Sequence, residues 1–340
     1  MGRLIANLDM YTPLSQIANS ARAAQSIGFD CLSIPDACHD GLTAAAIAAS
    51  ATQEIEIANS ALVCFPRSPM TTAVAVWDVQ ELSQGRYRLG LGPLVAPNII
   101  QKYSTPWYPP APRMREYVKS MSAIFRSWQY AEELNYRGKY YQFTRQQAYA
   151  APAPIEYPDI PLQLAAVGPN MMSLAGEIAD AVTLHPTNTS AHFISSTVLP
   201  ELNRGAYKAG RSTSDIEVIV NPFIAAGETP EELHESRNAF RRLLATVLST
   251  PNYWRSLELI DRAGIGPQLK KLYRDKQIDT MTKLIDDEIM DTFVLSATWE
   301  DLPGRLKEAY ASVSVSFAVN FDGSEKTRKH FGRLVRELKE

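Results

Sequence analysis

A short apolar run followed by a helical pattern recurs along this 340-residue chain, and this alternation most constrains its fold. Runs rich in β-branched and other apolar residues predict buried strands, and the residues between them suffice for crossover helices. We expect eight such strands, at 3–8, 29–35, 54–65, 86–92, 160–168, 180–186, 216–226 and 312–321. This count favours an α/β fold, a closed (β/α)8 TIM barrel, over an open sheet.

Helical patterns fill the intervals between these strands. Pro13 suits the start of the first helix, and Gly28 and Gly85 suit the ends of the first and third. The expected helices span 13–27, 41–53, 70–85, 113–129, 170–179, 191–209, 300–310 and 324–338.

Three segments interrupt the alternation. A loop at 93–112 and a segment at 130–159, with a hairpin at 133–143, follow the fourth strand. A polar and mostly helical segment at 229–290 follows the seventh strand. We therefore expect one domain, 1–340, with an inserted loop and hairpin after strand 4 and a helical insertion after strand 7.

Composition argues against several classes of partner. The net charge is −3, from 34 basic and 37 acidic residues without a block of like charge, which disfavours nucleic-acid binding. The first residues lack a signal-peptide pattern, and no apolar run reaches the about 18 residues of a membrane span, so we expect a cytoplasmic protein with no membrane partner. The three cysteines lack CxxC spacing, and no metal site is expected.

The stretch YRLGLGPL contains two glycines, Gly90 and Gly92, one residue apart. A dinucleotide fingerprint would require a third glycine where Val95 stands, and a helix start where Pro93 opens a loop. Two interpretations remain for the pair. Either both glycines let the strand pack closely inside the barrel, or Gly92 lets a flat ring approach the backbone at the ligand-binding face.

Three stretches resemble one family, the luciferase-like oxidoreductases that use a flavin or coenzyme F420. They are ALVCFPRSPMTTAVAVWDVQELSQGRYRLGLG (61–92), PWYPPAPRMREYVKSMSAIFRSW (106–128) and YPDIPLQLAAVGPNMMSLAGEIADAVTLHP (157–186). The third is the most specific, because it joins a strand, Val-Gly-Pro, a helix and Ala-Gly-Glu-x-Ala-Asp. The similarity covers most of the chain, is weakest over 229–290, and is nearer to the F420-dependent subgroup.

The resemblance implies a barrel that binds its cofactor at the C-terminal mouth. Ser60 and Ala61 match the place of a cis peptide behind the cofactor ring, and Gly92 and Asn98 would lie beside the ring or its ribityl chain. The residues that would hold the phosphate are Ala166, Val167, Gly168, Pro169 and Asn170. A helix that starts here offers free N–H groups to an anion, although an ordinary strand–helix turn is the alternative.

The candidate catalytic residues are Asp36, His39 and His185. The resemblance implies that Asp36 and His39 lie near the ring or substrate. His39 and His185 follow predicted strands, and a histidine that titrates near neutral pH can move a proton, although a structural hydrogen bond is the alternative for each. The remaining histidines are expected on surface helices; they are His192, His234 and His330.

Aromatic and proline residues suggest lids over the same face. Trp107 and Tyr108 lie in a loop that is expected either to close the site or to pack over the core. Arg67 is expected to pair with a carboxylate of cofactor or substrate, or to be solvated. The insertion at 229–290 is a second candidate lid, and its aromatic residues include Tyr253, Trp254 and Tyr273.

Three functions remain open from the sequence. The first is an oxidoreductase that transfers a hydride between F420 and a small organic substrate, and the second is a reduced-FMN monooxygenase of the same fold. The third is a barrel without a cofactor, which Pro93, a residue with no N–H to donate, and the apolar loop 94–100 suggest. The apolar helix faces make a homodimer the expected assembly.

Overall fold

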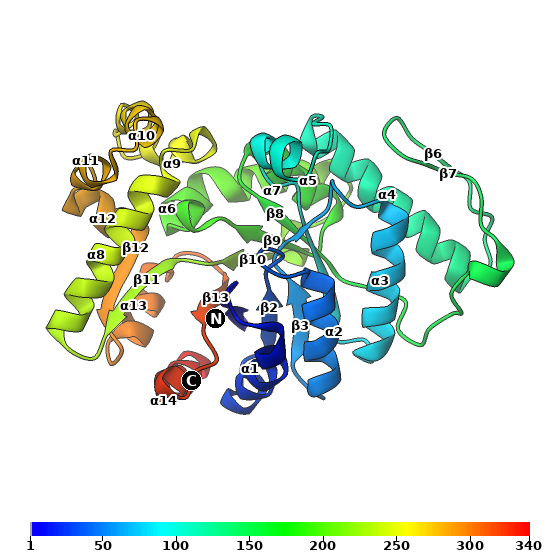
Figure 1. The fold of residues 1–340 in the computed structure, drawn as a ribbon, viewed down its shortest axis with the longest axis horizontal. Coiled ribbons are helices and arrows are strands. Elements are labelled where there is room, and N and C mark those ends of the chain that lie inside the picture. Colours follow the sequence, from blue (N-terminus) through cyan, green and yellow to red (C-terminus); the bar gives the residue numbers. More distant parts are fainter. Residues whose placement is uncertain (1) are drawn as a thin grey trace.

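Eight parallel strands close into a barrel in the computed structural model, which describes residues 2–340 (Figure 1). The barrel strands are β1 (Leu4–Leu8), β2 (Cys31–Ile34), β3 (Glu56–Asn59), β5 (Tyr87–Gly92), β8 (Leu162–Ala166), β9 (Ala181–Leu184), β10 (Glu217–Val220) and β13 (Ser316–Phe321). A short strand, β4 (Leu62–Val63), follows β3 and also pairs with β5. Pairing of β1 with β13 and of β3 with β5 closes the ring, which confirms the (β/α)8 barrel.

Helices surround the barrel close to the predicted positions. They are α1 (Leu14–Ile27), α2 (Gly41–Ala51), α3 (Pro69–Leu82), α4 (Pro110–Gln129), α5 (Pro169–Ile178), α6 (Ala191–Phe193), α7 (Leu199–Lys208), α13 (Leu302–Ala309) and α14 (Glu325–Lys339). A π-helical stretch, Ile194–Val198, joins α6 to α7. Gly28 ends α1 in the left-handed conformation, as predicted. The prediction for Gly85 is wrong: Ser83 caps α3, and Gly85, with φ +82°, lies in the turn before β5.

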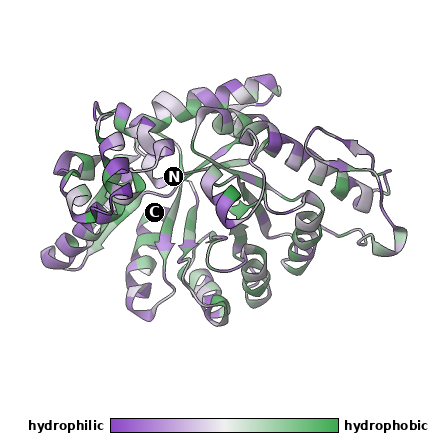
Figure 2. Ribbon diagram, turned by 45° about the horizontal axis from the view of Figure 1, so that its top comes forward, coloured by the Kyte–Doolittle hydropathy of each residue, from purple (hydrophilic) through white to green (hydrophobic). Residues whose placement is uncertain are grey.

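The predicted hairpin is present as β6 (Tyr136–Arg137) and β7 (Gln142–Phe143). The helical insertion comprises α8 (Pro230–Val247), α9 (Trp254–Glu258), α10 (Ile265–Arg274), α11 (Ile278–Lys283) and α12 (Asp287–Phe293). In Figure 2 the insertion helices carry more purple, hydrophilic residues than the barrel strands, in line with the polar sequence of this segment.

The predicted strand 216–226 is wrong in one respect, because it divides into two. Its first part is the barrel strand β10, and its second part, β11 (Phe223–Gly227), leaves the barrel and pairs in parallel with β12 (Val294–Thr298). Pro222 stands between them, and proline cannot donate to a strand ladder. Strand β12 was not expected from the sequence. These two strands and the insertion helices share a separate hydrophobic cluster that includes Phe223, Leu244 and Met281.

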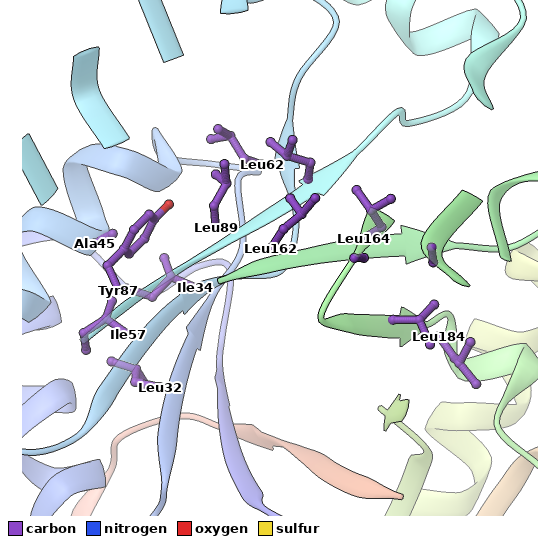
Figure 3. Packing of buried hydrophobic residues seen from close by; sticks show 14 of the residues in the cluster. Leu32, Ile34, Ala45, Ile57, Leu62, Tyr87, Leu89, Leu162, Leu164 and Leu184 are labelled. Carbon is purple, nitrogen blue, oxygen red and sulfur yellow. The ribbon is translucent and has the colours of Figure 1, made fainter. Parts of the chain in front are cut away.

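Two layers of side chains build the barrel. Residues that point outward, such as Leu32, Ile57 and Leu164, form the main hydrophobic core against the helices (Figure 3). The interior holds smaller residues, among them Cys31, Ala58 and Ala181.

Four alternating charges close the amino end of the barrel. Arg88 lies 2.9 Å from Glu217 and 3.1 Å from Glu56, and Arg3 lies 2.8 Å from Glu56. Paired charges thus fill the interior of the barrel at its amino end.

Two glycines fix the position of α5 beside the barrel. A Cβ on Gly205 of α7 would lie 1.7 Å from the carbonyl oxygen of Ser173, and a Cβ on Gly176 of α5 would lie 2.1 Å from that of Leu202. The two helix backbones are therefore in direct contact. This contact holds the amino end of α5 at the mouth of the barrel.

Candidate active site

The carboxyl ends of the barrel strands surround a cavity of about 520 Å³. A larger depression of about 1280 Å³ lies at the amino end, but TIM barrels bind their ligands at the carboxyl face. The lining residues are Pro35, Asp36, Ser60, Ala61, Val63, Gly92–Pro97, Trp107, Pro110, Ala165, Val167–Met171, Asn252 and Tyr253. The cavity thus joins strand ends to the 93–112 loop and to the helical insertion.

Asp36 lines the cavity, as expected, but both its carboxylate oxygens are already occupied. Oδ1 accepts from the backbone N–H of Gly41 and Oδ2 from that of Val63, each at 2.9 Å. The side chain is 8% exposed and also faces Arg67 at 3.4 Å. These bonds tie the loop after β2 to β4, so the geometry favours a positioning role over proton transfer.

The wall behind β5 contains the peptide bond between Ser60 and Ala61, which is cis as the resemblance implied. Both residues line the cavity beside Gly92, where an added Cβ would lie 3.0 Å from the Cβ of Ala61. Gly90 is different, because a Cβ there would lie 1.6 Å from the carbonyl oxygen of Asn59. Each of the two interpretations therefore applies to one glycine: Gly90 permits close packing of the strands, and Gly92 faces the cavity.

Helix α5 opens onto the cavity at the turn that the sequence singled out. Gly168 is the N-cap residue, with no side-chain cap, and a Cβ added to it would meet no atom within 4 Å. Pro169 has no N–H, and the N–H groups of Met171 and Met172 both donate to the carbonyl of Gly168, at 3.1 and 3.0 Å. Within residues 2–340, the N–H groups of Gly168 and Asn170 have no such partner, and N–H groups of this kind at a helix N-terminus suit an anion.

Two of the predicted cofactor residues do not lie in the wall. Ala166 is buried in the hydrophobic core, because side chains alternate along β8 and it is Ala165 that faces the cavity. Asn98 is exposed at the start of a π-helical turn, Asn98–Lys102, and does not line the cavity.

Only part of the predicted lid loop lines the cavity. Trp107 lines the cavity and packs edge-on against Phe65, with ring centroids 6.2 Å apart. Tyr108 is 45% exposed and packs on Tyr140 of the hairpin.

Arg113 holds this loop in place and was not singled out from the sequence. Its guanidinium donates to the carbonyls of Phe65 and Pro106, each at 3.1 Å, and to the hydroxyl of Tyr141 at 2.8 Å. The available signal was an arginine on the apolar face of a predicted helix, beside Met114.

Arg67 meets neither expectation. Its guanidinium donates to Asp40 at 2.6 Å and to Asp36 at 3.4 Å. Burial alone would lower the pKa of Arg67, but the two carboxylates raise it above its usual value. The side chain is paired within the protein and does not line the cavity.

The histidines differ in their surroundings. His39 lies half-buried in the loop after β2, outside the cavity wall. His185 follows β9 and stacks on Tyr253, with ring centroids 4.0 Å apart and planes 15° apart. The prediction of an exposed His330 is wrong: its side chain is 11% exposed, bonded to Glu228 and stacked on Trp299.

A buried polar network, which the sequence did not predict, joins the cavity turn to the insertion. Asn188 donates to the carbonyl of Val167 at 3.1 Å and accepts from the hydroxyl of Ser256 at 2.8 Å. Next to it, Tyr253 is the aromatic residue of the insertion that reaches the cavity. Trp254 instead packs inside the insertion, with its ring nitrogen donating to Leu248, and Tyr273 is half exposed.

Comparison with known proteins identifies the family. The sequence profile of the family described as luciferase-like monooxygenase matches residues 3–316. The chain belongs to the luciferase-like monooxygenase family. An uncharacterised protein of Mycobacterium tuberculosis is 34% identical over 294 residues, which cover 86% of each chain.

Two solved structures share the fold of this chain. The coenzyme F420-dependent tetrahydromethanopterin reductase of Methanopyrus kandleri superposes with a TM-score of 0.80, at 19% identity, over 99% of this chain and 98% of that one. The oxygenating constituent of 3,6-diketocamphane monooxygenase from Pseudomonas putida, in complex with FMN, gives 0.65 at 15% identity over 99% and 98%. At these identities the likeness concerns the fold.

Two further features of this luciferase-like chain bear on its chemistry. Within residues 2–340, no three His, Cys, Asp or Glu side chains are grouped as metal ligands. Over the same range, no helix has both the length and the hydropathy that crossing a bilayer requires.

His185 makes the stability of this luciferase-like protein depend on acidity. Desolvation lowers the pKa of His185 from 6.5 to about 4, so its imidazole is neutral at physiological pH, contrary to the expectation that it titrates near pH 7. As the pH falls below 6.5, the unfolded chain binds a proton that the folded chain does not. We expect the free energy of unfolding to fall by roughly 2 to 3 kcal/mol from this group between pH 6.5 and 4.

Urea unfolding at several pH values tests this expectation. His185→Phe retains a ring against Tyr253 but cannot titrate, so its stability should decline less over the acidic range than that of the wild type. Parallel pH curves for the two proteins would show that His185 is solvated in the folded state.

Proposed function

We propose that this protein is an oxidoreductase that transfers a hydride between coenzyme F420 and a small organic substrate in the cavity at the carboxyl end of the barrel. The observation that carries the proposal is the open turn before α5, where Gly168 leaves room for a phosphate beside the N–H groups of Gly168 and Asn170. The fold likeness to an F420-dependent reductase supports it.

The residues of the cavity fit a cofactor of this shape. Val167, Gly168, Pro169 and Asn170 would hold the phosphate, and the wall of Ser60, Ala61 and Gly92 would take a flat ring. No part is proposed for Ala166 and Asn98, which lie outside the wall.

Bound F420 supplies a carbon that donates or accepts a hydride. The chain itself must hold the substrate against that carbon and exclude water. Trp107 and the loop of Leu94 close one side of the cavity, and Tyr253 closes another. The phenol of Tyr253 is the wall group suited to donate a hydrogen bond or proton to a substrate oxygen, and the neutral ring of His185 positions it by stacking. Burial raises the pKa of Tyr253, which keeps the phenol protonated.

Reduced FMN is the alternative cofactor, and the family's monooxygenases, including the FMN-bound neighbour, support it. Pro93 still favours the third candidate, a barrel without a cofactor, because it lines the cavity and has no N–H to offer a ring.

A fluorescence titration separates the three candidates. Purified protein is mixed with F420 and, separately, with FMN, and quenching of cofactor fluorescence is followed. We expect saturable binding of F420 at micromolar protein and weaker binding of FMN. Binding of FMN alone would support the monooxygenase, and binding of neither would reject both redox functions.

A further inference from the structure

The cavity wall offers no free positive charge to a substrate. Among the described residues that line it, none is lysine, arginine or histidine. Its one charged residue is Asp36, which is acidic and bonded to two backbone N–H groups. A carboxylate or phosphate on the substrate would therefore lie near a negative charge and without a cationic partner.

Two arginines on segments that also contribute to this wall are engaged within the protein. Arg113 directs all three guanidinium nitrogens to protein oxygens, those of Phe65, Pro106 and Tyr141. Arg67 is paired with Asp40 and Asp36. Freeing either side chain for a ligand would leave buried acceptors unpaired, which is unfavourable.

His185, which lies behind the wall, does not add a positive charge to the cavity. His185 lies under Tyr253, and burial keeps its imidazole neutral at physiological pH. It therefore supplies neither a charge nor a direct contact to the cavity.

Most side chains of the cavity wall are apolar. Val63, Leu94, Val95, Trp107 and Pro110 present hydrocarbon and an aromatic ring. The polar side chains of the wall are neutral amides and hydroxyls apart from Asp36, and they include Asn252 and Tyr253 of the insertion. Such a wall stabilises a ligand by removing apolar surface from water and orients it by one or two hydrogen bonds.

We propose that the substrate of this site is a neutral and largely apolar small molecule whose polar groups are no more than a hydroxyl or a carbonyl. This inference rests on the proposed function in one respect: the anion-binding turn before α5 is assigned to the cofactor phosphate. The remainder of the cavity then excludes sugar phosphates, carboxylates and other anions.

A matched pair of probes tests the charge preference directly. Cyclohexylmethanol and cyclohexanecarboxylate share a ring and differ in charge. Their binding to the purified protein is measured by tryptophan fluorescence and by calorimetry, in phosphate buffer so that inorganic phosphate competes for the turn at 167–170. We expect the alcohol to bind tighter than the carboxylate by about tenfold or more, because the carboxylate loses hydration without a partner.

A charge introduced into the wall should reverse this order. Val95→Arg places a cation in the cavity and is expected to favour the carboxylate. Ile100→Arg is the matched control, because Ile100 is 52% exposed and does not line the cavity, so it should retain the preference of the wild type.

Equal or tighter binding of the carboxylate by the wild type would overturn the inference, and so would binding of neither probe at millimolar concentration. Neither readout requires F420 or FMN, so failure of the cofactor titration and failure of this preference are separate results.

Discussion

Replacing Gly90 by alanine is expected to lower the free energy of unfolding by about 3 kcal/mol. The added Cβ would lie 1.6 Å from the carbonyl oxygen of Asn59 and 3.3 Å from the side-chain amide of Gln163. The first of these is backbone of a neighbouring barrel strand, which cannot move aside as a flexible side chain can. Strands β3 and β5 must therefore separate where they close the barrel.

Urea unfolding followed by circular dichroism measures this effect. Gly332→Ala is the matched control, since a Cβ at Gly332 in α14 meets nothing within 4 Å. Alanine there should stabilise the protein by up to about 1 kcal/mol through helix propensity. Equal stability of Gly90→Ala and wild type would mean that the strand spacing at β3 and β5 is wider than described.

Gly168→Asp is expected to weaken binding of the cofactor by about tenfold or more, which corresponds to roughly 1.4 kcal/mol. The new carboxylate would lie at the N-terminus of α5, where it takes the favourable position of the cofactor phosphate and repels it. Folding should be unaffected, because the space around Gly168 is open and its φ of −105° suits any residue.

Two further variants separate charge from bulk at this position. Gly168→Asn has nearly the shape of aspartate without its charge, and Gly168→Ala adds only a methyl group. We expect cofactor affinity, measured by fluorescence titration, to fall in the order glycine, alanine, asparagine, aspartate, with the largest step at aspartate. Unchanged affinity in folded Gly168→Asp would remove the phosphate from this turn.

The barrel could be predicted because residues within each βα unit set where its strand and its helix begin and end. Gly28 ends α1, Pro169 opens α5, and each strand is a short and mostly apolar run. Strand β12 could not be predicted in this way, because its partner β11 is about 70 residues earlier and Pro222 interrupts an apolar run that otherwise continues. Pairing across such a distance depends on the folding of the whole insertion between the two strands.

The candidate site could likewise be predicted only in part. The turn at 168–170 and the cis bond at Ser60–Ala61 were placed from local sequence and family resemblance. The neutral state of His185 depends instead on its burial in the folded chain, where it stacks on Tyr253, 68 residues later. The pairing of Arg67 depends on Asp36 and Asp40 from another βα unit. Burial and ion pairing of this kind are set by tertiary contacts that no single segment contains.

The bonds of Asn188 have a consequence for how such chains can be recombined. Its amide joins the carbonyl of Val167, on the cavity turn, to the hydroxyl of Ser256, within the insertion. A chimera that takes the insertion from a relative without a donor at position 256 would lose the bond from Ser256, at a cost of about 0.5–1.5 kcal/mol, and would leave the hydroxyl of Thr187, at 3.3 Å, as the donor to the amide oxygen. The insertion and the turn should therefore be exchanged together. Grafts that aim to change the substrate should carry Asn188, Ser256 and Tyr253 from the same parent.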